Sequence, residues 1–297
     1  MDVLSEALAA MRTGRTRSAR TDVRAPWGLR FPAVTGTTFH VVLQGTCWLL
    51  PGDGTAPLPL SAGDVVFLRE GSAHALADQP GSPLIEFVPS RETPDSPIGQ
   101  VRVDGPGDRA ILLCGAYQLD RARPHPLMRD LPALIHLTRS PELGPLVDLL
   151  ARELDLSLPG RDGIVPSLVD AMLLYILRAW TGGDASRWGL ALSDRAISHA
   201  LRDIHARPEH PWTVEELATR GGVSRSVFAE RFTALVGQPP MTYLAWWRMT
   251  SAGRMLRESD TPLRTVAQSV GYTSEFAFAK AFKRAYGTPP GRYRRPA

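Results

Sequence analysis

Two short stretches in the last third of the chain carry side chains that can hydrogen-bond to the bases and phosphates of a nucleic acid. Arginine can pair with guanine and a carboxylate can accept a hydrogen bond from cytosine, each good contact discriminating between bases by ~1–3 kcal/mol. Arg225 is a candidate for the first contact, and Glu230 and Glu275 are candidates for the second. The candidate set is Ser224, Arg225, Ser226, Ala229 and Glu230 in the first stretch, and Ser274, Glu275, Phe276, Lys280 and Arg284 in the second. Arg292, Arg294 and Arg295 are further candidates to hold phosphates.

The elements that must position these residues are two copies of one helix–turn–helix pattern. Corresponding residues of the copies lie 49 or 50 positions apart, because the second copy has one extra residue at its turn. Such a repeat indicates two copies of one supersecondary unit, and this unit is the one that places a helix in the major groove of DNA. The matched pairs are Ala218 and Ala267, Gly222 and Gly271, Phe228 and Phe278, Phe232 and Phe282, and Gly237 and Gly287.

Local signals fix where the helices of each copy begin and end. Gly222 and Gly271 suit a turn with positive φ. Ser224 is the predicted N-cap of the helix after the first turn, and either Thr273 or Ser274 is that of the helix after the second. The phenylalanines of each copy lie four residues apart, so they point into a core and leave the opposite helix face exposed. Three further starts are predicted: Ser193 as an N-cap, Thr213 with Glu216 as a capping box, and Thr261 as an N-cap before Pro262.

A helix predicted over residues 241–258 joins the two copies and would let both recognition helices enter successive major-groove segments, roughly 34 Å apart. The alternative for the exposed faces is a solvated helix surface, and for Phe276 it is a core position. Two copies in tandem, with matched caps and matched Gly-x-Pro-Pro ends, argue against the solvated-surface alternative for the pair.

Composition is that of a soluble globular protein, with 43% hydrophobic and 22% charged residues. Residues 194–297 carry 16 Lys and Arg against 9 Asp and Glu, a net charge of +7, whereas the rest of the chain has a net charge of −3. The basic part favours a polyanionic partner. Two cysteines without a CxxC motif, no signal peptide, and a longest apolar run of only seven residues (171–177) predict a cytoplasmic protein with no membrane partner.

The N-terminal part has a different pattern. A helix is predicted from Val3 to Met11, and short apolar runs from residue 27 to 119, separated by Gly, Pro and Asp, indicate an all-β sandwich or barrel. Helices are predicted over 141–156 and 166–180. The expected division is a sensor domain at 1–140, a helical linker or dimerisation region at 141–192 and a DNA-binding domain at 193–297. The linker helices have two alternative roles, and the second is at least as well supported as the first. They form a dimer seam through Leu168, Met172, Tyr175 and Leu177, or they only cover their own barrel.

The C-terminal pattern resembles the DNA-binding domain of the AraC/XylS family of bacterial transcription regulators. The resemblance covers about a third of the chain and implies a bipartite helical unit that binds double-stranded promoter DNA, with RNA polymerase as a partner, activation of transcription and control by a small-molecule effector. The residues that carry it are Ala218, Gly222 and Phe232, then Arg248, Ala252 and Leu256, then Val266, Ala267, Gly271, Tyr272, Phe278, Phe282, Lys283, Gly287, Pro290 and Arg292.

The N-terminal part resembles the cupin sensor domain found in that family. Gly63, Asp64, Gly71 and His74 match the second cupin motif with Arg69 in place of its proline, and the segment from His40 to Gly45 resembles the end of the first motif. Thr38 stands where metal-binding cupins have a glutamate, so the usual ligand set is incomplete. The chain is therefore expected to be an α+β multidomain protein, with a cupin-like β-barrel and accessory helices followed by an all-α domain with two helix–turn–helix motifs.

Several residues of the cupin-like part could bind a metal. His40, His74, Cys114 and His125 would form a zinc-like set of nitrogen and sulfur ligands. The alternative is that the histidines are satisfied by hydrogen bonds and Cys114 is an ordinary buried cysteine. Redox sensing through Cys47 or Cys114 is a further hypothesis.

Three functions compete on the sequence alone: an effector-controlled transcription regulator, a cupin enzyme tethered to DNA, and a module whose barrel binds another protein. The incomplete first cupin motif argues against the enzyme. The regulator, without catalytic activity and controlled by a small molecule, a metal or a redox signal, is the favoured interpretation.

Overall fold

The computed structural model describes residues 2–14, 16–91, 96–119, 123–156, 158–183 and 186–294. The chain forms two compact units. The sheet unit consists of Gly14–Leu119 and Pro132–Arg178, and the helical unit consists of Met1–Thr13, Asp120–Leu131 and Ala179–Ala297.

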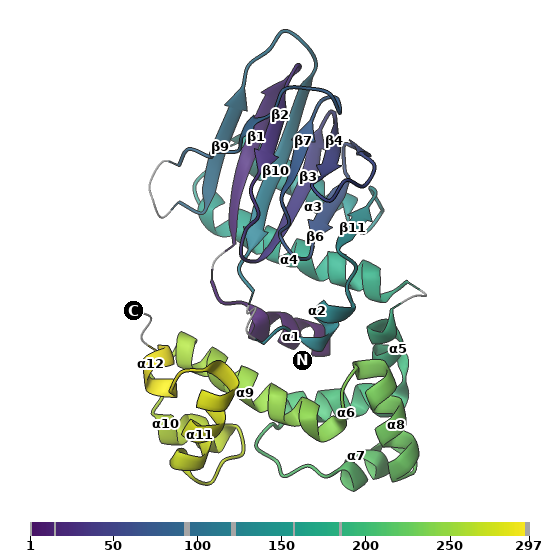
Figure 1. The fold of residues 1–297 in the computed structure, drawn as a ribbon, viewed down its shortest axis with the longest axis vertical. Helices are drawn as coiled ribbons and strands as arrows, with labels where there is room; N and C mark the ends of the chain where they lie inside the picture. The colour runs from purple at the N-terminus through teal and green to yellow at the C-terminus, as the bar shows by residue number, and fades with distance from the viewer. Residues whose placement is uncertain are drawn as a thin grey trace. The chain divides into compact units, whose positions relative to one another are not determined.

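The sheet unit is built from two sheets. A six-stranded sheet has the order β11-β6-β3-β10-β1-β9 and a five-stranded sheet has the order β5-β4-β7-β2-β8, and most neighbouring strands run antiparallel (Figure 1). The strands are β1 (Arg17–Arg24), β2 (Gly28–Phe31), β3 (Thr37–Gln44), β4 (Thr46–Pro51), β5 (Leu58–Ser61), β6 (Val65–Leu68), β7 (His74–Ala77), β8 (Ile85–Glu86), β9 (Ile98–Val103), β10 (Arg109–Tyr117) and β11 (Leu134–Leu137). The expected cupin-like β-structure is confirmed.

The core of the sheet unit lies between the two sheets. Leu29, Leu49 and Leu76 of the five-stranded sheet pack in one cluster with Val42 and Leu112 of the six-stranded sheet, and all five are essentially unexposed. Side chains alternate between the faces of a strand, so every second residue of these strands is available to this core.

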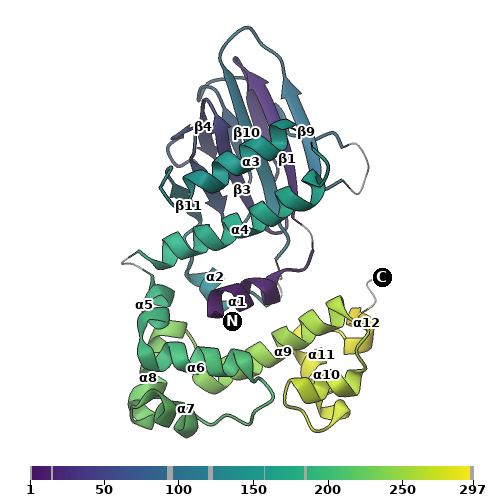
Figure 2. The ribbon, with the colours of Figure 1, turned by 180° about the vertical axis from the view of Figure 1, so that it is seen from behind.

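Two helices, α3 (Gly144–Leu156) and α4 (Arg161–Thr181), lie over the six-stranded sheet (Figure 2). The Tyr117 hydroxyl donates a hydrogen bond of 2.8 Å to the Val169 carbonyl oxygen and so ties β10 to α4. By length and composition α4 could cross a membrane. A third of the residues in its most apolar window, 33%, are buried inside the protein, and the buried side chains include Val165, Val169 and Ile176.

Two of the four residues of the predicted dimer seam are buried inside the chain and cannot contact a second copy. Met172 and Leu177 are each no more than 1% exposed within the chain itself, whereas Leu168 and Tyr175 are only partly buried. A helix face that covers its own sheet repeats its apolar residues at the same spacing as a face that binds a partner, which is why the pattern left both alternatives open.

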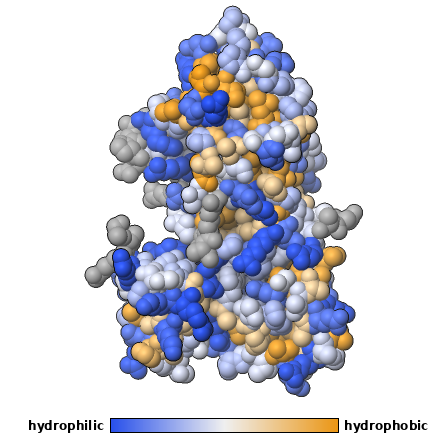
Figure 3. Space-filling view, in the orientation of Figure 1, coloured by the Kyte–Doolittle hydropathy of each residue, from blue (hydrophilic) through white to orange (hydrophobic). Residues whose placement is uncertain are grey.

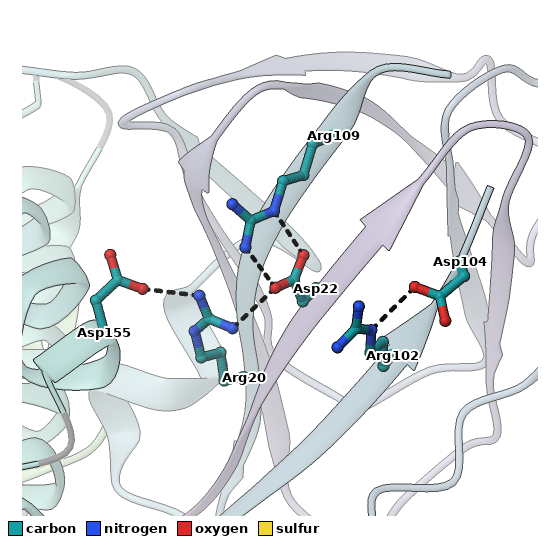
Figure 4. Close-up of polar contacts among 6 residues, drawn as sticks. All are labelled: Arg20, Asp22, Arg102, Asp104, Arg109 and Asp155. Atoms are coloured by element: carbon teal, nitrogen blue, oxygen red, sulfur yellow. Dashed lines mark hydrogen bonds and ion pairs between the residues drawn. The ribbon is translucent and has the colours of Figure 1, made fainter. Parts of the chain in front are cut away.

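An ion-pair network lies on the outer side of the six-stranded sheet (Figure 4). Asp22 on β1 pairs with Arg109 on β10 at 2.6 Å and with Arg20 at 3.1 Å, and Arg20 also pairs with Asp155 of α3 at 2.7 Å. The Arg109 hydrogen bond is the main reason that the pKa of Asp22 falls to about 2. This network joins two strands and a covering helix.

The helical unit is arranged around the long helix α9, with α5 to α8 toward one end and α10 to α12 toward the other (Figure 1). The N-terminal helix α1 contacts α6 and α9, and its predicted bounds, Val3 to Met11, are confirmed. The helices are α1 (Val3–Met11), α2 (Pro126–Asp130), α5 (Arg187–Ser193), α6 (Arg195–Ala206), α7 (Val214–Gly221), α8 (Arg225–Val236), α9 (Pro240–Glu258), α10 (Leu263–Ser269), α11 (Glu275–Tyr286) and α12 (Pro290–Arg294).

Two predicted helix starts are wrong by one residue. Ser193 ends α5, and the cap of α6 is Asp194, whose carboxylate accepts hydrogen bonds from the Ala196 and Ile197 amides. Pro262, not Thr261, stands at the N-cap position of α10 and makes no side-chain capping bond. The Thr213 cap is confirmed, because its hydroxyl accepts from the Glu216 amide at 3.1 Å.

The compact units cut the chain differently from the expected division into 1–140, 141–192 and 193–297. Residues 1–13 and 120–131 cluster with the C-terminal helices, and residues 132–178, including α3 and most of α4, cluster with the sheets. Sequence order alone does not show which core a terminal helix joins.

Candidate functional site

The two helix–turn–helix motifs have the turn geometry that their glycines predicted. Gly222 follows α7 in the left-handed conformation, with φ of 71°, and Gly271 has φ of 80° in the second motif. Ser224 and Ser274 then cap α8 and α11, because their hydroxyls accept hydrogen bonds from the Val227 and Ala277 amides at 3.4 and 3.3 Å. Any side chain other than hydrogen is strained at such φ values.

Paired phenylalanines set the rotation of each recognition helix about its axis. Phe228 and Phe232 on α8, and Phe278 and Phe282 on α11, are completely buried. The rings of each pair lie 5.6 and 5.7 Å apart between centroids. Residues four apart share one face of a helix, so the positions between them are directed away from the core.

The predicted DNA-contacting residues occupy the outer faces of these helices. Nine of the ten are exposed, and Ala229 is partly buried. Phe276 is 80% exposed, so the alternative that it belongs to the core is wrong. In the described part of the chain, five charged members of the set form no ion pair or side-chain hydrogen bond: Arg225, Glu230, Glu275, Lys280 and Arg284.

Other arginines of the helical unit are used inside it. Arg231 pairs with Asp194 at 3.2 Å and Arg220 pairs with Asp203 at 2.6 Å. Arg248 donates to the carbonyl oxygens of Pro208 and His210 at 2.6 and 2.9 Å, which ties the middle of α9 to the loop before α7. The unpaired charges on α8 and α11 therefore contrast with paired or bonded ones nearby.

The predicted phosphate contacts have mixed outcomes. Arg292 is exposed at the start of α12. Arg294 does not point to a free phosphate site as expected. Its guanidinium donates to the backbone carbonyl oxygens of Thr261 and Asp260 and so ties α12 to the loop before α10. Arg295 lies outside the described residues.

The long helix α9 packs against both motifs. It has 19 residues and is therefore about 28 Å long at 1.5 Å per residue. Its Ala252 and Leu256 pack with Phe278 and Phe282 of the second motif, and its Tyr243 ring packs against Phe232 of the first. This length is close to one turn of DNA, roughly 34 Å. The face of the helical unit seen in Figure 3 is mostly hydrophilic, with small apolar areas.

The sheet unit contains a cavity of about 230 Å³ that reaches the surface. Phe31, Val34 and Phe87 are among its apolar walls, and His40 and Cys114 also line it. Cys114 on β10 and His40 on β3 face each other across a strand pair. This cavity is the candidate site for an effector.

Two of the predicted metal ligands, His40 and His74, bond to each other. Their Nε2 atoms are 2.7 Å apart, and His74 Nδ1 lies 2.7 Å from the Ser72 carbonyl oxygen. That oxygen can only accept, so His74 carries its proton on Nδ1 and His40 donates from Nε2. Burial lowers the pKa of both rings, so both are neutral. His40 Nδ1 remains as a buried acceptor without a partner in the described part of the chain.

The metal set is not assembled. His125 belongs to the helical unit, where its Nδ1 accepts the Leu127 amide at 3.1 Å and its Nε2 lies 3.3 Å from the Tyr243 hydroxyl. Among the described residues no group of three or more His, Cys, Asp or Glu is placed to hold a metal ion. The residues present do not fit a zinc ion. The Nε2 atoms of His40 and His74 form a hydrogen bond with each other, and both nitrogens of His125 form hydrogen bonds with Leu127 and Tyr243.

The two cysteines are buried and unbridged. Burial raises the pKa of Cys47 to about 12, and it raises that of Cys114 even further above its ordinary value. Oxidants react with the thiolate, so both thiols are poorly placed for redox sensing.

A buried polar chain in the helical unit was not anticipated from the sequence. Glu6 Oε2 lies 3.1 Å from His205 Nδ1, and His205 Nε2 lies 2.7 Å from the Tyr243 hydroxyl, which in turn contacts His125 Nε2. His125 accepts on Nδ1, so it donates from Nε2 to the phenol oxygen, and the phenol donates to His205 Nε2. His205 therefore carries its proton on Nδ1, which lies 3.1 Å from Glu6 Oε2 but forms no hydrogen bond in the described part of the chain. The Tyr243 hydroxyl is satisfied both as a donor and as an acceptor.

Comparison with known proteins agrees with this architecture. Residues 2–182 match the family model described as Cupin, and residues 217–296 match the one described as Helix-turn-helix domain. A protein named as an AraC-like transcription regulator, from Streptomyces lividans, is 32% identical over 99% of this chain and 98% of its own length. The HTH-type transcriptional regulator AlkR of Acinetobacter baylyi is 30% identical over 99% of both chains.

Among solved structures, the DNA-binding domain of the global transcriptional factor AdpA, in complex with a target DNA, is 33% identical. It matches 34% of this chain and 90% of that chain, with a TM-score of 0.32. The full-length relatives and the two family models together identify the protein: it belongs to the AraC-like family of DNA-binding transcription regulators, with an N-terminal cupin domain.

Proposed function

We propose that the chain binds promoter DNA in a sequence-specific manner through α8 and α11, and that an effector bound in the sheet unit controls this binding. The observation that carries the first part is the set of unpaired charged side chains on two capped helices. Arg225 on α8 and Lys280 on α11 are exposed and have no ion-pair partner in the described part of the chain. Cations in this position can contact guanine or phosphate.

The effector part is supported by the cavity between strands of the sheet unit and by the poor fit of the alternatives. The histidines do not form a metal set, and the cysteines are buried and protonated. A small molecule is therefore the favoured signal, and it would act by shifting the population between two arrangements of the protein.

The proposal includes RNA polymerase and a second copy of this chain as partners, a role in activation and a cytoplasmic location without membrane attachment. It excludes catalysis, because the relatives are named as transcription regulators. A homodimer would have to use surfaces other than Met172 and Leu177, which are buried.

A gel-shift assay on the DNA upstream of the protein's own gene tests the DNA-binding part. R225A and K280A should each weaken specific binding by about 1–3 kcal/mol if the side chain reads a base. R102A is the matched control, because Arg102 is an exposed arginine of the sheet unit that pairs with Asp104. Equal binding by all three variants would contradict the proposal.

A further inference from the structure

The cavity of the sheet unit has mostly apolar walls and two arginines that form no ion pair in the described part of the chain. We propose that it binds a small amphipathic organic acid, whose carboxylate is held by Arg17 and Arg91 and whose apolar body lies against Phe31 and Phe87. This inference rests on the proposed function only in that the acid would be the effector.

The apolar part of the site comes from two strands and a following loop. Phe31 at the end of β2 and Phe87 just after β8 have ring centroids 4.4 Å apart, and both line the cavity with Pro32, Val34 and Pro89. A volume of about 230 Å³ is below that of sites for drug-sized molecules. The ligand is therefore small, and aromatic or short aliphatic groups match the wall.

The charged part of the site is Arg17 at the start of β1 and Arg91 after β8, which both line the cavity. Arg91 donates to the Ser96 carbonyl oxygen at 2.6 Å, and neither guanidinium contacts a carboxylate in the described part of the chain. Partial burial, and then the charge of Arg17, lower the pKa of Arg91. Two like charges beside one cavity favour an anion, and guanidinium binds carboxylate in a fork geometry.

This pair differs from the other arginines of the same unit, many of which have carboxylate partners. The paired arginines are Arg20, Arg30, Arg69, Arg102, Arg109, Arg139 and Arg161. Arg17 and Arg91 therefore stand apart from these residues, because both line the cavity and neither has a carboxylate partner in the described part of the chain.

Two residues that line the cavity, Thr38 and His40, each have a buried polar atom without a partner in the described part of the chain. These atoms are Thr38 Oγ1 and His40 Nδ1. A buried polar atom without a partner costs about 1–3 kcal/mol. A ligand hydroxyl would donate to His40 Nδ1 and accept from the Thr38 hydroxyl, so the preferred acid carries a hydroxyl at the end away from its carboxylate.

Calorimetric titration of the full chain tests this with 3-(4-hydroxyphenyl)propanoate, its neutral amide and 3-phenylpropanoate as probes. The acid should bind, and the amide should bind at least about tenfold more weakly because it lacks the charge that the guanidiniums recognise. R91Q and R17Q should each reduce the affinity for the acid by about tenfold and narrow the difference between acid and amide. R102Q is the matched control and should bind like the parent.

A second variant tests the contact with the ligand hydroxyl without touching the cations. T38V removes one of the two hydrogen-bond partners of the ligand hydroxyl, so it should reduce the advantage of the hydroxylated acid over 3-phenylpropanoate while leaving the difference between acid and amide in place. Arg17 is exposed, so R17Q should not change the stability of the fold. A thermal melt of each variant checks that a loss of binding is not a loss of folding.

Three results would overturn the inference: no binding of either acid at millimolar concentration, equal binding of acid and amide, or an R91Q variant that binds the acid as R102Q does. A gel shift with the same preparations keeps the two proposals distinct. Intact DNA binding without acid binding removes this inference alone, whereas acid binding without DNA binding contradicts the DNA-binding proposal alone.

Discussion

The buried polar chain of the helical unit makes a strong prediction for the single hydroxyl at its centre. Y243F removes the oxygen that accepts from His125 Nε2 and the proton donated to His205 Nε2, at 3.3 and 2.7 Å. Tyr243 is 0% exposed, and His125 and His205 are buried too, so water does not replace the lost partner. The packing of the ring against Phe232 is kept by phenylalanine.

The magnitude follows from the two groups that would be left unsatisfied. Each buried donor or acceptor without a partner costs about 1–3 kcal/mol, and the longer His125 contact belongs at the lower end of that range. The expected loss is about 2–4 kcal/mol. It should fall on the elements that the chain connects, namely α1 through Glu6, the segment before α2 through His125, and α6 and α9.

Hydrogen exchange measured by mass spectrometry locates the effect, because it reports the free energy of opening for each segment. Peptides from α1, α6 and α9 should lose protection by at least about tenfold, which corresponds to 1.4 kcal/mol. The matched control is Y272F, since the Tyr272 hydroxyl has no hydrogen-bond partner in the described part of the chain. A Y243F variant whose exchange equals that of Y272F would refute the assigned chain of hydrogen bonds.

Three further expectations follow from the same structure. Burial lowers the pKa of His40, His74, His125 and His205 below the ordinary value of 6.5; the unfolded chain then takes up protons first as the pH falls below about 6.5. The contribution of these neutral rings to the free energy of unfolding is fully present above that pH and declines below it, by up to about 1.4 kcal/mol per pH unit for each ring. Equal thermal midpoints at pH 7.5 and 5.5 would contradict the assignment of neutral rings. Cys47 and Cys114 should react with iodoacetamide at pH 8 only when the protein is unfolded, because burial raises the pKa of both thiols; rapid alkylation of folded protein would revive the redox hypothesis. Metal analysis of untagged protein should find far less than one zinc per chain, and a stoichiometric ion would show that His40 and His74 are ligands after all.

The DNA-binding motifs were predictable because their signals are local. The glycine turn, the serine cap and the phenylalanine pair of each copy lie within about 15 residues of one another, and the repeat displays each of them twice. Local rules did not fix the helix start where two adjacent residues could both act as the N-cap. Ser193 and Asp194 are both good caps, and only the structure shows that the aspartate accepts from the α6 amides.

The buried chain of Glu6, His205, Tyr243 and His125 was not predictable for the opposite reason. Its hydrogen bonds join residues 38 and 118 positions apart, and Glu6 lies in a different segment of the chain from the rest. The predicted metal set groups His125 with the cupin histidines, whereas in the structure His125 packs with Trp188 and Trp246 of the helical unit. Spacing along a chain does not report which core a side chain enters.

The cavity cations were missed because the sequence shows only that the chain is rich in arginine. Neither Arg17 nor Arg91 belongs to a motif, and what distinguishes them is the lack of a carboxylate partner in the described part of the chain. The incomplete first cupin motif is visible in the sequence itself, because Thr38 stands where a glutamate is expected.

The central claim is that α8 and α11, joined by α9, contact one DNA duplex in two successive major-groove segments. Methylation interference at guanine N7, which lies in the major groove, measures this directly on a selected genomic fragment. We expect two patches of interference about 10 base pairs apart, with R225A weakening one patch and K280A weakening the other. A single patch, or the same patch lost in both variants, would contradict the account.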